Sequence, residues 1–194
     1  MQTIKPYEMI TDYITGRSVP DVGAEANRQA IERMLVEEKG FSPSQIAVDV
    51  PVAFTVAGEP YDSAVDLVVF AEDRPFLVIK CAAGSLDSRK KEVIAAARIV
   101  YDTVVPYAAA SDGQTALVFE TASARQIGQG LEALPDAARA GQMIGRAEPV
   151  RLSQKQVEKA RLVFRSYDSM NVNVGRRVSE DPEAKGAPHE TGGD

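Results

Sequence analysis

Three apolar segments separated by short turns are the feature that most constrains the fold of this chain. Apolar residues occupy every second position from Ile46 to Val56, and the segments AVDLVVF (64–70) and FLVIKC (76–81) follow. A period of two indicates a half-buried strand, and short apolar runs between turns are consistent with more buried strands. Short connections join antiparallel neighbours, so the sequence predicts a three-stranded meander with turns at 58–63 and 71–75, and with Pro51 at an edge or bulge.

Helices are expected on both sides of this meander. The segment 18–41 has an apolar stripe of Ile31, Met34 and Leu35, a cap at Asp21 or a neighbour, and a stop at Gly40. A second helix is expected over 84–105. Its candidate caps are Ser85, Asp87 and Ser88, and its candidate packing residues are Val93, Ala96, Ala97, Val100 and Tyr101.

The remaining segments complete an α/β (α+β) fold with a mixed sheet flanked by helices. Two short strands are expected around the Asp112–Gly113 turn, and a helix followed by a strand suggests a parallel crossover. An amphipathic helix is expected over 152–167. We therefore divide the chain into an N-terminal segment with a short helix (1–20), a core (21–150), a C-terminal helix (151–168) and a disordered tail (169–194).

Composition narrows the chemistry that this fold can carry. The chain has one cysteine, Cys81, expected to be a small buried apolar residue, and one histidine, His189, in the tail. A disulfide framework, a cysteine-rich metal site and a histidine-based triad are thereby excluded. No run approaches the roughly 20 apolar residues of a membrane helix, and no signal peptide is visible, so we expect a cytoplasmic protein without membrane contact.

Asp66 and Lys80 are the polar residues that stand out within the predicted strands. Asp66 is flanked by valines and a leucine, where an unpaired carboxylate would cost several kcal/mol. A hairpin turn near positions 73–74 would bring Asp66 opposite a residue around 80 or 81. The sequence therefore predicts contact between the Asp66 carboxylate and the Lys80 ammonium, although Lys80 could instead extend to solvent.

The chain resembles the N-terminal domain of type I restriction enzyme R subunits, a branch of the PD-(D/E)xK nuclease superfamily. The resemblance covers about 11–140 and rests on EANRQAIERMLVEEKGF, VDLVVF, RPFLVIKCAAGSL, AAARIVYDTVVPYAAASDG and IGQGLEALPD in this order. It implies a restriction endonuclease-like core and a site at which two carboxylates hold Mg²⁺ and a lysine stabilises phosphate charge.

The resemblance assigns roles to individual residues. Glu25 takes the place of the glutamate of the first helix, Arg28 that of the basic residue after it, and Asp66 that of the metal-binding aspartate. The Glu-x-Lys motif falls on Lys80, Cys81 and Ala82, so a lysine replaces the metal-binding glutamate and an alanine replaces the catalytic lysine. Of the Gln-x-x-x-Tyr pattern on the next helix, only Tyr101 remains.

The altered motif leaves two interpretations of the site open. Asp66 and Lys80 together carry about zero charge, which predicts poor Mg²⁺ binding and a structural ion pair in the metal's place. The alternative is a rearranged nuclease site in which Asp66 binds Mg²⁺. This site would use Glu25, Asp66, Lys80 and a carboxylate that has moved to the next helix, such as Glu92.

Basic residues after the third strand suggest a nucleic-acid contact. Arg89, Lys90 and Lys91 are expected in the first helical turn, where backbone amides also favour phosphate, and Arg98 could extend the patch. A solvated helix face is the simpler explanation, because the net charge of −6 argues against general nucleic-acid binding. Arg28 is a further candidate DNA contact by resemblance.

Three functions remain in contention. The first is a non-catalytic module that binds nucleic acid or a protein partner, the second an Mg²⁺-dependent DNA endonuclease, and the third a structural protein, with a homodimer possible through a sheet edge or the last helix. No Gly-x-x-x-x-Gly-Lys-Ser/Thr sequence occurs, so ATP-driven translocation is excluded within this chain.

Overall fold

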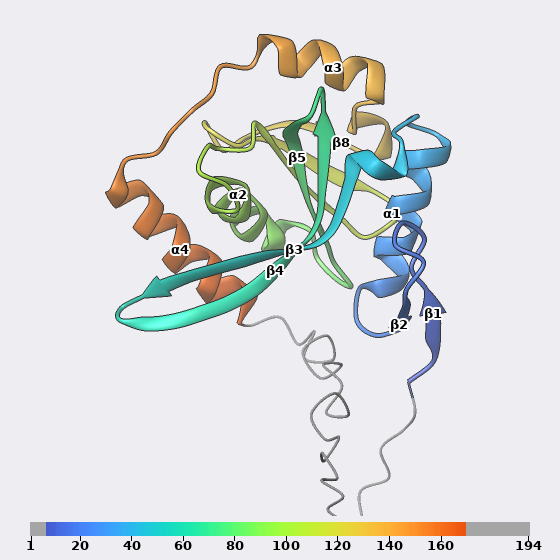
Figure 1. The fold of residues 1–194 in the computed structure, drawn as a ribbon, viewed down its shortest axis with the longest axis horizontal. Coiled ribbons are helices and arrows are strands. Elements are labelled where there is room, and N and C mark those ends of the chain that lie inside the picture. The colour runs from blue at the N-terminus through green and yellow to red at the C-terminus, as the bar shows by residue number, and fades with distance from the viewer. Residues whose placement is uncertain (1–6, 170–194) are drawn as a thin grey trace, which may run out of the picture.

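A six-stranded mixed sheet forms the centre of the computed structural model, which describes residues 7–169 (Figure 1). The strand order is β3-β4-β5-β6-β7-β8, and every neighbouring pair is antiparallel except β5 and β6. The strands are β3 (Ile46–Val56), β4 (Glu59–Ala71), β5 (Arg74–Cys81), β6 (Tyr107–Ser111), β7 (Ala116–Glu120) and β8 (Arg125–Gln129). The predicted α/β fold class, with its meander and parallel crossover, is confirmed.

Helices cover both faces of this sheet. The main helices are α1 (Glu25–Glu37), α2 (Lys90–Ile99), α3 (Ala137–Arg146) and α4 (Gln154–Asp168). One core cluster joins α1 and α3 to the face that carries Leu77, Ile79 and Cys81. The other joins α2 and α4 to the face that carries Val78 and Ala82. Since side chains alternate along a strand, Lys80 belongs to the face that α2 and α4 cover.

The core residues of the predicted helices and strands are placed as expected. Ile31, Met34 and Leu35 are buried on α1, and Cys81 is buried at the end of β5. Pro51 lies on β3, an edge strand, where a missing N–H costs no ladder hydrogen bond. Gly40 follows α1 with a positive φ of 74°, a conformation that favours glycine.

Several expectations about element boundaries are wrong. The N-terminal segment forms a hairpin of β1 (Met9–Thr11) and β2 (Ser18–Pro20), not a short helix. The residue at the N-cap of α1 is Ala24, not Asp21, and α2 begins after a 3₁₀ turn (Asp87–Arg89) with no side-chain cap.

Other boundaries also differ from the expectation. Strand β4 begins at Glu59, so the expected turn at 58–63 shrinks to Ala57 and Gly58. Helix α2 ends at Ile99, which leaves Val100 and Tyr101 outside it. Strand β8 and helix α3 were not expected. The predicted tail, with His189, lies outside the described residues apart from Ser169.

Over residues 7–169, no helix combines the length and the apolar character that crossing a membrane requires.

Candidate functional site

Asp66 and Lys80 meet on neighbouring strands, as the hairpin register predicts. Leu67 pairs with Ile79 in the β4–β5 ladder, so Asp66 and Lys80 are next in register. The Lys80 Nζ lies 3.5 Å from Asp66 Oδ1, and both side chains are buried. The other oxygen, Asp66 Oδ2, accepts a hydrogen bond of 2.6 Å from the Cys81 backbone N–H. The predicted contact is therefore confirmed.

Two helices bring further carboxylates to the same ammonium. Glu92 in the first turn of α2 lies 3.4 Å from Lys80 Nζ through Oε1, and Asp168 at the end of α4 lies 3.9 Å away through Oδ1. The second Glu92 oxygen is 3.2 Å from the guanidinium of Arg89. We call Lys80, Asp66, Glu92 and Asp168 the Lys80 cluster. The proximity of Glu92 to Asp66 and Lys80, required by the rearranged-site interpretation, is present.

The carboxylates of the Lys80 cluster hold the lysine in its charged form. Burial alone would lower the pKa of Lys80, but the negative charges of Asp66, Glu92 and Asp168 raise it well above its ordinary value. The ammonium is therefore permanent at neutral pH. Lys80 can act as a fixed positive charge, and it cannot serve as a general base there.

The residues of this cluster do not fit the Mg²⁺ that the family resemblance implies. Mg²⁺ requires oxygen ligands in near-octahedral geometry, and here the point shared by three carboxylates is taken by a nitrogen cation. Among residues 7–169, no group of three or more His, Cys, Asp and Glu side chains is arranged to hold a metal ion.

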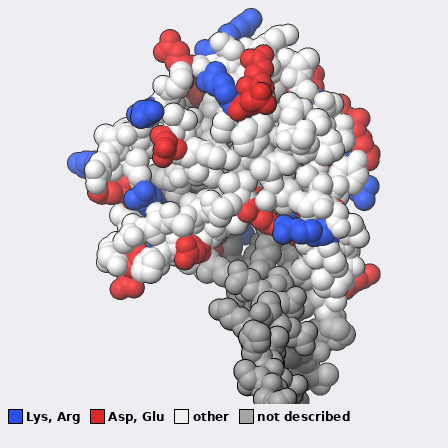
Figure 2. Space-filling view, in the orientation of Figure 1, with Lys and Arg blue, Asp and Glu red and all other residues white. Residues whose placement is uncertain are grey.

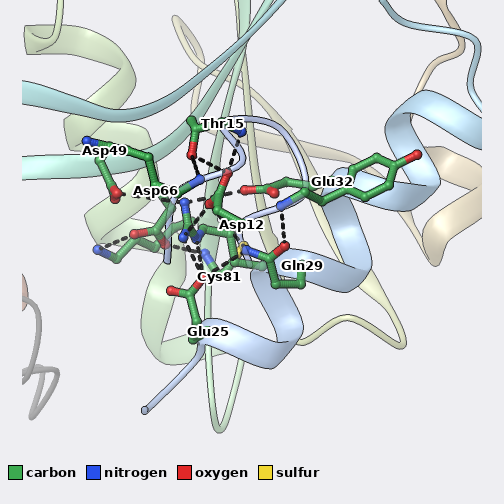
Figure 3. Close-up of polar contacts among 12 residues, drawn as sticks. Asp12, Thr15, Glu25, Gln29, Glu32, Asp49, Asp66 and Cys81 are labelled. Atoms are coloured by element: carbon green, nitrogen blue, oxygen red, sulfur yellow. Dashed lines mark hydrogen bonds and ion pairs between the residues drawn. The ribbon is translucent and has the colours of Figure 1, made fainter. Parts of the chain in front are cut away.

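A second buried cation comes from α1 and lies beside Asp66 and Cys81, which Figure 3 draws together with its carboxylates. Arg28 of α1 has a side chain only 1% exposed, and its guanidinium pairs with Asp12 at 2.8 Å, with Glu25, with Glu32 at 3.3 Å and with Asp49 at 3.7 Å. We call these five residues the Arg28 cluster. Figure 3 shows its carboxylates directed toward a common point.

Neighbouring polar residues fix the orientation of these carboxylates. The Gln29 side-chain amide donates to Glu25 at 2.9 Å and to Asp12 at 3.2 Å, while Asp12 also accepts from Thr15. Asp49 adopts a positive φ of 52°, which interrupts the β3–β4 pairing between Val48 and Val50. The register is the same on both sides of Asp49, and this local irregularity accompanies the contribution of a strand carboxylate to the cluster.

Glu32 is the member of the Arg28 cluster with the most perturbed protonation. Its side chain is fully buried on α1. Burial raises the pKa of Glu32 to about 7, and the charges of Asp12 and Glu25 add to this effect, while Arg28 opposes it. The Arg28 cluster can therefore change its net charge near neutral pH.

This placement changes the roles predicted for Glu25 and Arg28. Glu25 is committed to Arg28 and Gln29, so its side chain belongs to an ion-pair network. Arg28 is enclosed by carboxylates in the interior, and a DNA phosphate could not reach it without displacing them. We therefore do not retain Arg28 as a nucleic-acid contact.

The predicted basic patch is divided among separate contacts. Arg89 pairs with Glu92, the Lys90 ammonium lies over the Phe119 ring at 5.3 Å, and Lys91 lies over Tyr167 at 5.9 Å. Arg98 donates to the carbonyls of Thr121 and Ala122, so it does not extend the patch as we expected. Figure 2 shows basic and acidic side chains interspersed on the visible face.

Four carboxylates of the two clusters were not identified from the sequence: Asp12, Glu32, Asp49 and Asp168. Asp168 is far from Lys80 along the chain, and only the docking of α4 brings them together. Glu32, which is fully buried in the structure, gave the one local signal in the sequence. It lies next to Ile31 and close to Met34 within the apolar stripe of its helix.

The fold and its buried ionic clusters define a mixed α/β domain of the kind the sequence resemblance implies. A family model for the type I restriction enzyme R protein N terminus (HSDR_N) matches residues 23–135. The chain belongs to this family. No curated protein and no solved structure matches the chain.

Proposed function

We propose that this chain is a non-catalytic member of the family that keeps the domain as a DNA-binding module. The observation that supports the proposal is the position of Lys80. Its ammonium lies between 3.4 and 3.9 Å from three carboxylates, at the point where a metal ion would have to sit. A permanent lysine charge at this point gives the domain stability without the Lewis acid needed for phosphodiester hydrolysis.

The proposed DNA contact is the beginning of α2. The 3₁₀ turn before α2 already engages the Arg89 and Lys90 backbone N–H groups, so the contact rests on the ammonium groups of Lys90 and Lys91. Neighbouring ammonium groups favour a phosphate in a sequence-independent manner. The match to a restriction enzyme family supports DNA as the partner. An acidic protein partner is the alternative ligand for Lys90 and Lys91.

Anisotropy titration with a fluorescent duplex tests this proposal. The double variant Lys90→Glu/Lys91→Glu should weaken binding at least tenfold, because it reverses two positive charges at the start of α2. The matched control Lys155→Glu/Lys159→Glu makes the same charge change on the exposed face of α4 and should have a much smaller effect. Equal losses in both variants would contradict a specific contact at α2.

A metal-dependent DNA endonuclease is the second candidate. The convergence of Asp66, Glu92 and Asp168 on one point favours it, because only the lysine separates these carboxylates from a metal-binding geometry. Plasmid cleavage with Mg²⁺ or Mn²⁺ that is lost in Asp66→Ala would establish this function in place of the first.

A further inference from the structure

The carboxylate of Asp168 is held by donors from the sheet. Its Oδ2 accepts hydrogen bonds from Tyr61 Oη at 2.5 Å and from Ser63 Oγ at 2.6 Å, while Oδ1 faces the Lys80 ammonium at 3.9 Å. Tyr61 and Ser63 are two positions apart on β4 and therefore project from the same face. Two hydroxyl groups and an ammonium thus surround one anionic group.

Helix stability does not account for an aspartate at this position. Asp168 is the last residue of α4, where the helix dipole presents its negative end and favours cations. An acidic residue there opposes the dipole. The contacts with Tyr61, Ser63 and Lys80 are what keep this carboxylate in place.

Helix α4 packs mainly along α2, and its contact with the sheet around Asp168 is narrow. Within α4, only Ala160 and Phe164 are buried below the surface. The Phe164 ring packs edge-on against Phe54 and Tyr61, with centroids 6.2 and 6.5 Å away. A mostly exposed connection without helix or strand, residues 147–153, precedes the helix, which lies along α2 and the β3–β4 hairpin (Figure 1). The end of α4 can therefore lift while the sheet stays intact.

We propose that Tyr61, Ser63 and Lys80 form a binding site for a phosphate oxyanion, which the chain closes with its own Asp168 carboxylate. A phosphate group presents oxygens that accept from the same hydroxyl and ammonium donors. Because it would occupy the position of the Asp168 carboxylate, binding displaces the end of α4. The anionic ligand and α4 are competitors for one site.

This inference rests on the proposed function only in treating Lys80 as a fixed cation. It does not involve Lys90 or Lys91. If DNA does not bind at α2, the phosphate site proposed here still stands. If the phosphate site fails its test, the proposed α2 contact still stands.

Calorimetric titration of the full chain with inorganic phosphate tests the site directly. Asp168→Ala should bind phosphate about tenfold more tightly than the unchanged chain, because the internal competitor is gone. The matched control Glu158→Ala removes an exposed carboxylate from the same helix and should change nothing. Adding Tyr61→Phe and Ser63→Ala to Asp168→Ala should abolish the gain. No gain in Asp168→Ala, or an equal gain in Glu158→Ala, would overturn the proposal.

Hydrogen exchange of the unchanged chain is a second test, and it needs none of these variants to fold. Phosphate should accelerate amide exchange over 154–168 relative to chloride at equal ionic strength, and unchanged exchange would overturn the proposal. An oligonucleotide with and without a 5′-phosphate separates the two sources of the group. Acceleration by the phosphorylated form alone identifies a terminal monoester, and equal acceleration by both identifies the backbone diester.

Discussion

At the scale of single residues, two buried cations organise the charged interior of the domain. Lys80 balances Asp66, Glu92 and Asp168 on the face covered by α2 and α4. Arg28 of α1 balances four carboxylates. Carboxylates without such a partner would be too costly to bury, so the two cations are requirements of the fold whatever the domain binds.

Removing the Lys80 charge should destabilise the domain strongly. Lys80→Met keeps the length of the side chain but leaves the surrounding carboxylates without their shared cation. We expect a loss of about 3–5 kcal/mol in the free energy of unfolding, measured by urea denaturation at pH 7. Lys155→Met, an exposed lysine on α4, is the control and should change stability by less than about 0.5 kcal/mol. A comparably small loss in Lys80→Met would mean that the charge is not needed.

Glu32 should make stability depend on pH in a definite direction. Because the folded-state pKa of about 7 is above the ordinary value of 4.5, Glu32 favours folding most below pH 4.5, and this contribution disappears as pH rises through 7. The full change is on the order of 3 kcal/mol. Asp12 has a lowered pKa, so its contribution to stability has the opposite pH dependence. It is present above the ordinary pKa of 3.8 and is lost as the pH falls below that value.

The variant Glu32→Gln isolates this contribution. Its stability relative to the unchanged chain should increase between pH 5 and pH 8, because glutamine has no proton to lose. Denaturant unfolding at both pH values measures the difference, and the exposed Glu38→Gln on the same segment is the control. Parallel pH profiles for Glu32→Gln and the unchanged chain would contradict the raised pKa.

The sequence predicted one part of the Lys80 cluster and missed another. The Asp66–Lys80 contact followed from the hairpin turn, and the candidacy of Glu92 followed from the resemblance. Asp168 could not be predicted because its contact depends on the position of α4 in three dimensions. The i,i+3 spacing of Glu25 and Arg28 is a local signal of their pairing, but Asp12 and Asp49 come from segments far from α1 in the sequence.

At the scale of elements, α4 is an addition to the matched family region that nevertheless completes the Lys80 cluster. The family model ends at residue 135, whereas α4 begins at Gln154. Phe164 and Asp168, one helical turn apart, fasten this helix to β4 together with Arg165, whose guanidinium lies over the Tyr61 ring. The attachment of α4 should therefore be separable from the stability of the sheet.

Shortening Phe164 should loosen α4 selectively. Phe164→Ala removes a fully buried ring, a change that costs about 3–5 kcal/mol when the site cannot collapse. Amide exchange over 154–168 should rise sharply while β5 keeps its protection. Leu162→Ala, at a side chain 53% exposed, should leave both unchanged. Uniform loss of protection across the sheet would show that α4 is an integral part of the core.

Local patterns predicted the elements with strong periodicity and failed for the others. The alternation in β3 and the apolar run in β5 identified the meander, and α4 was placed within two residues of its ends. Strand β8 is largely exposed and polar, and β1 and β2 are three residues each, so hydrophobic patterning could not reveal them.

At the scale of the whole molecule, the distribution of charge limits the size of the proposed DNA contact. The chain carries a net charge of −6, and its basic residues are interspersed with acidic ones on the face in Figure 2. A small contact at α2 therefore fits better than an extended basic groove. The possible homodimer stays a prediction, which light scattering of the purified chain would check.

The salt dependence of DNA binding reports the size of this contact. Neutralisation of two or three phosphates corresponds to a slope of about −2 to −3 in a plot of log affinity against log salt concentration. We expect a slope in this range from anisotropy titrations between 50 and 200 mM salt. A slope several times steeper would require an extended interface that α2 alone cannot supply.

The central claim is that the Lys80 ammonium stands in place of a metal ion, and calorimetric titration with Mn²⁺ tests it most directly. The unchanged chain should bind no Mn²⁺ at the Lys80 cluster. Lys80→Glu should bind one Mn²⁺ and become more stable to heat when it is added, because it replaces the ammonium with a further carboxylate beside Asp66 and Glu92. Stoichiometric Mn²⁺ binding by the unchanged chain, abolished by Asp66→Ala, would contradict the claim.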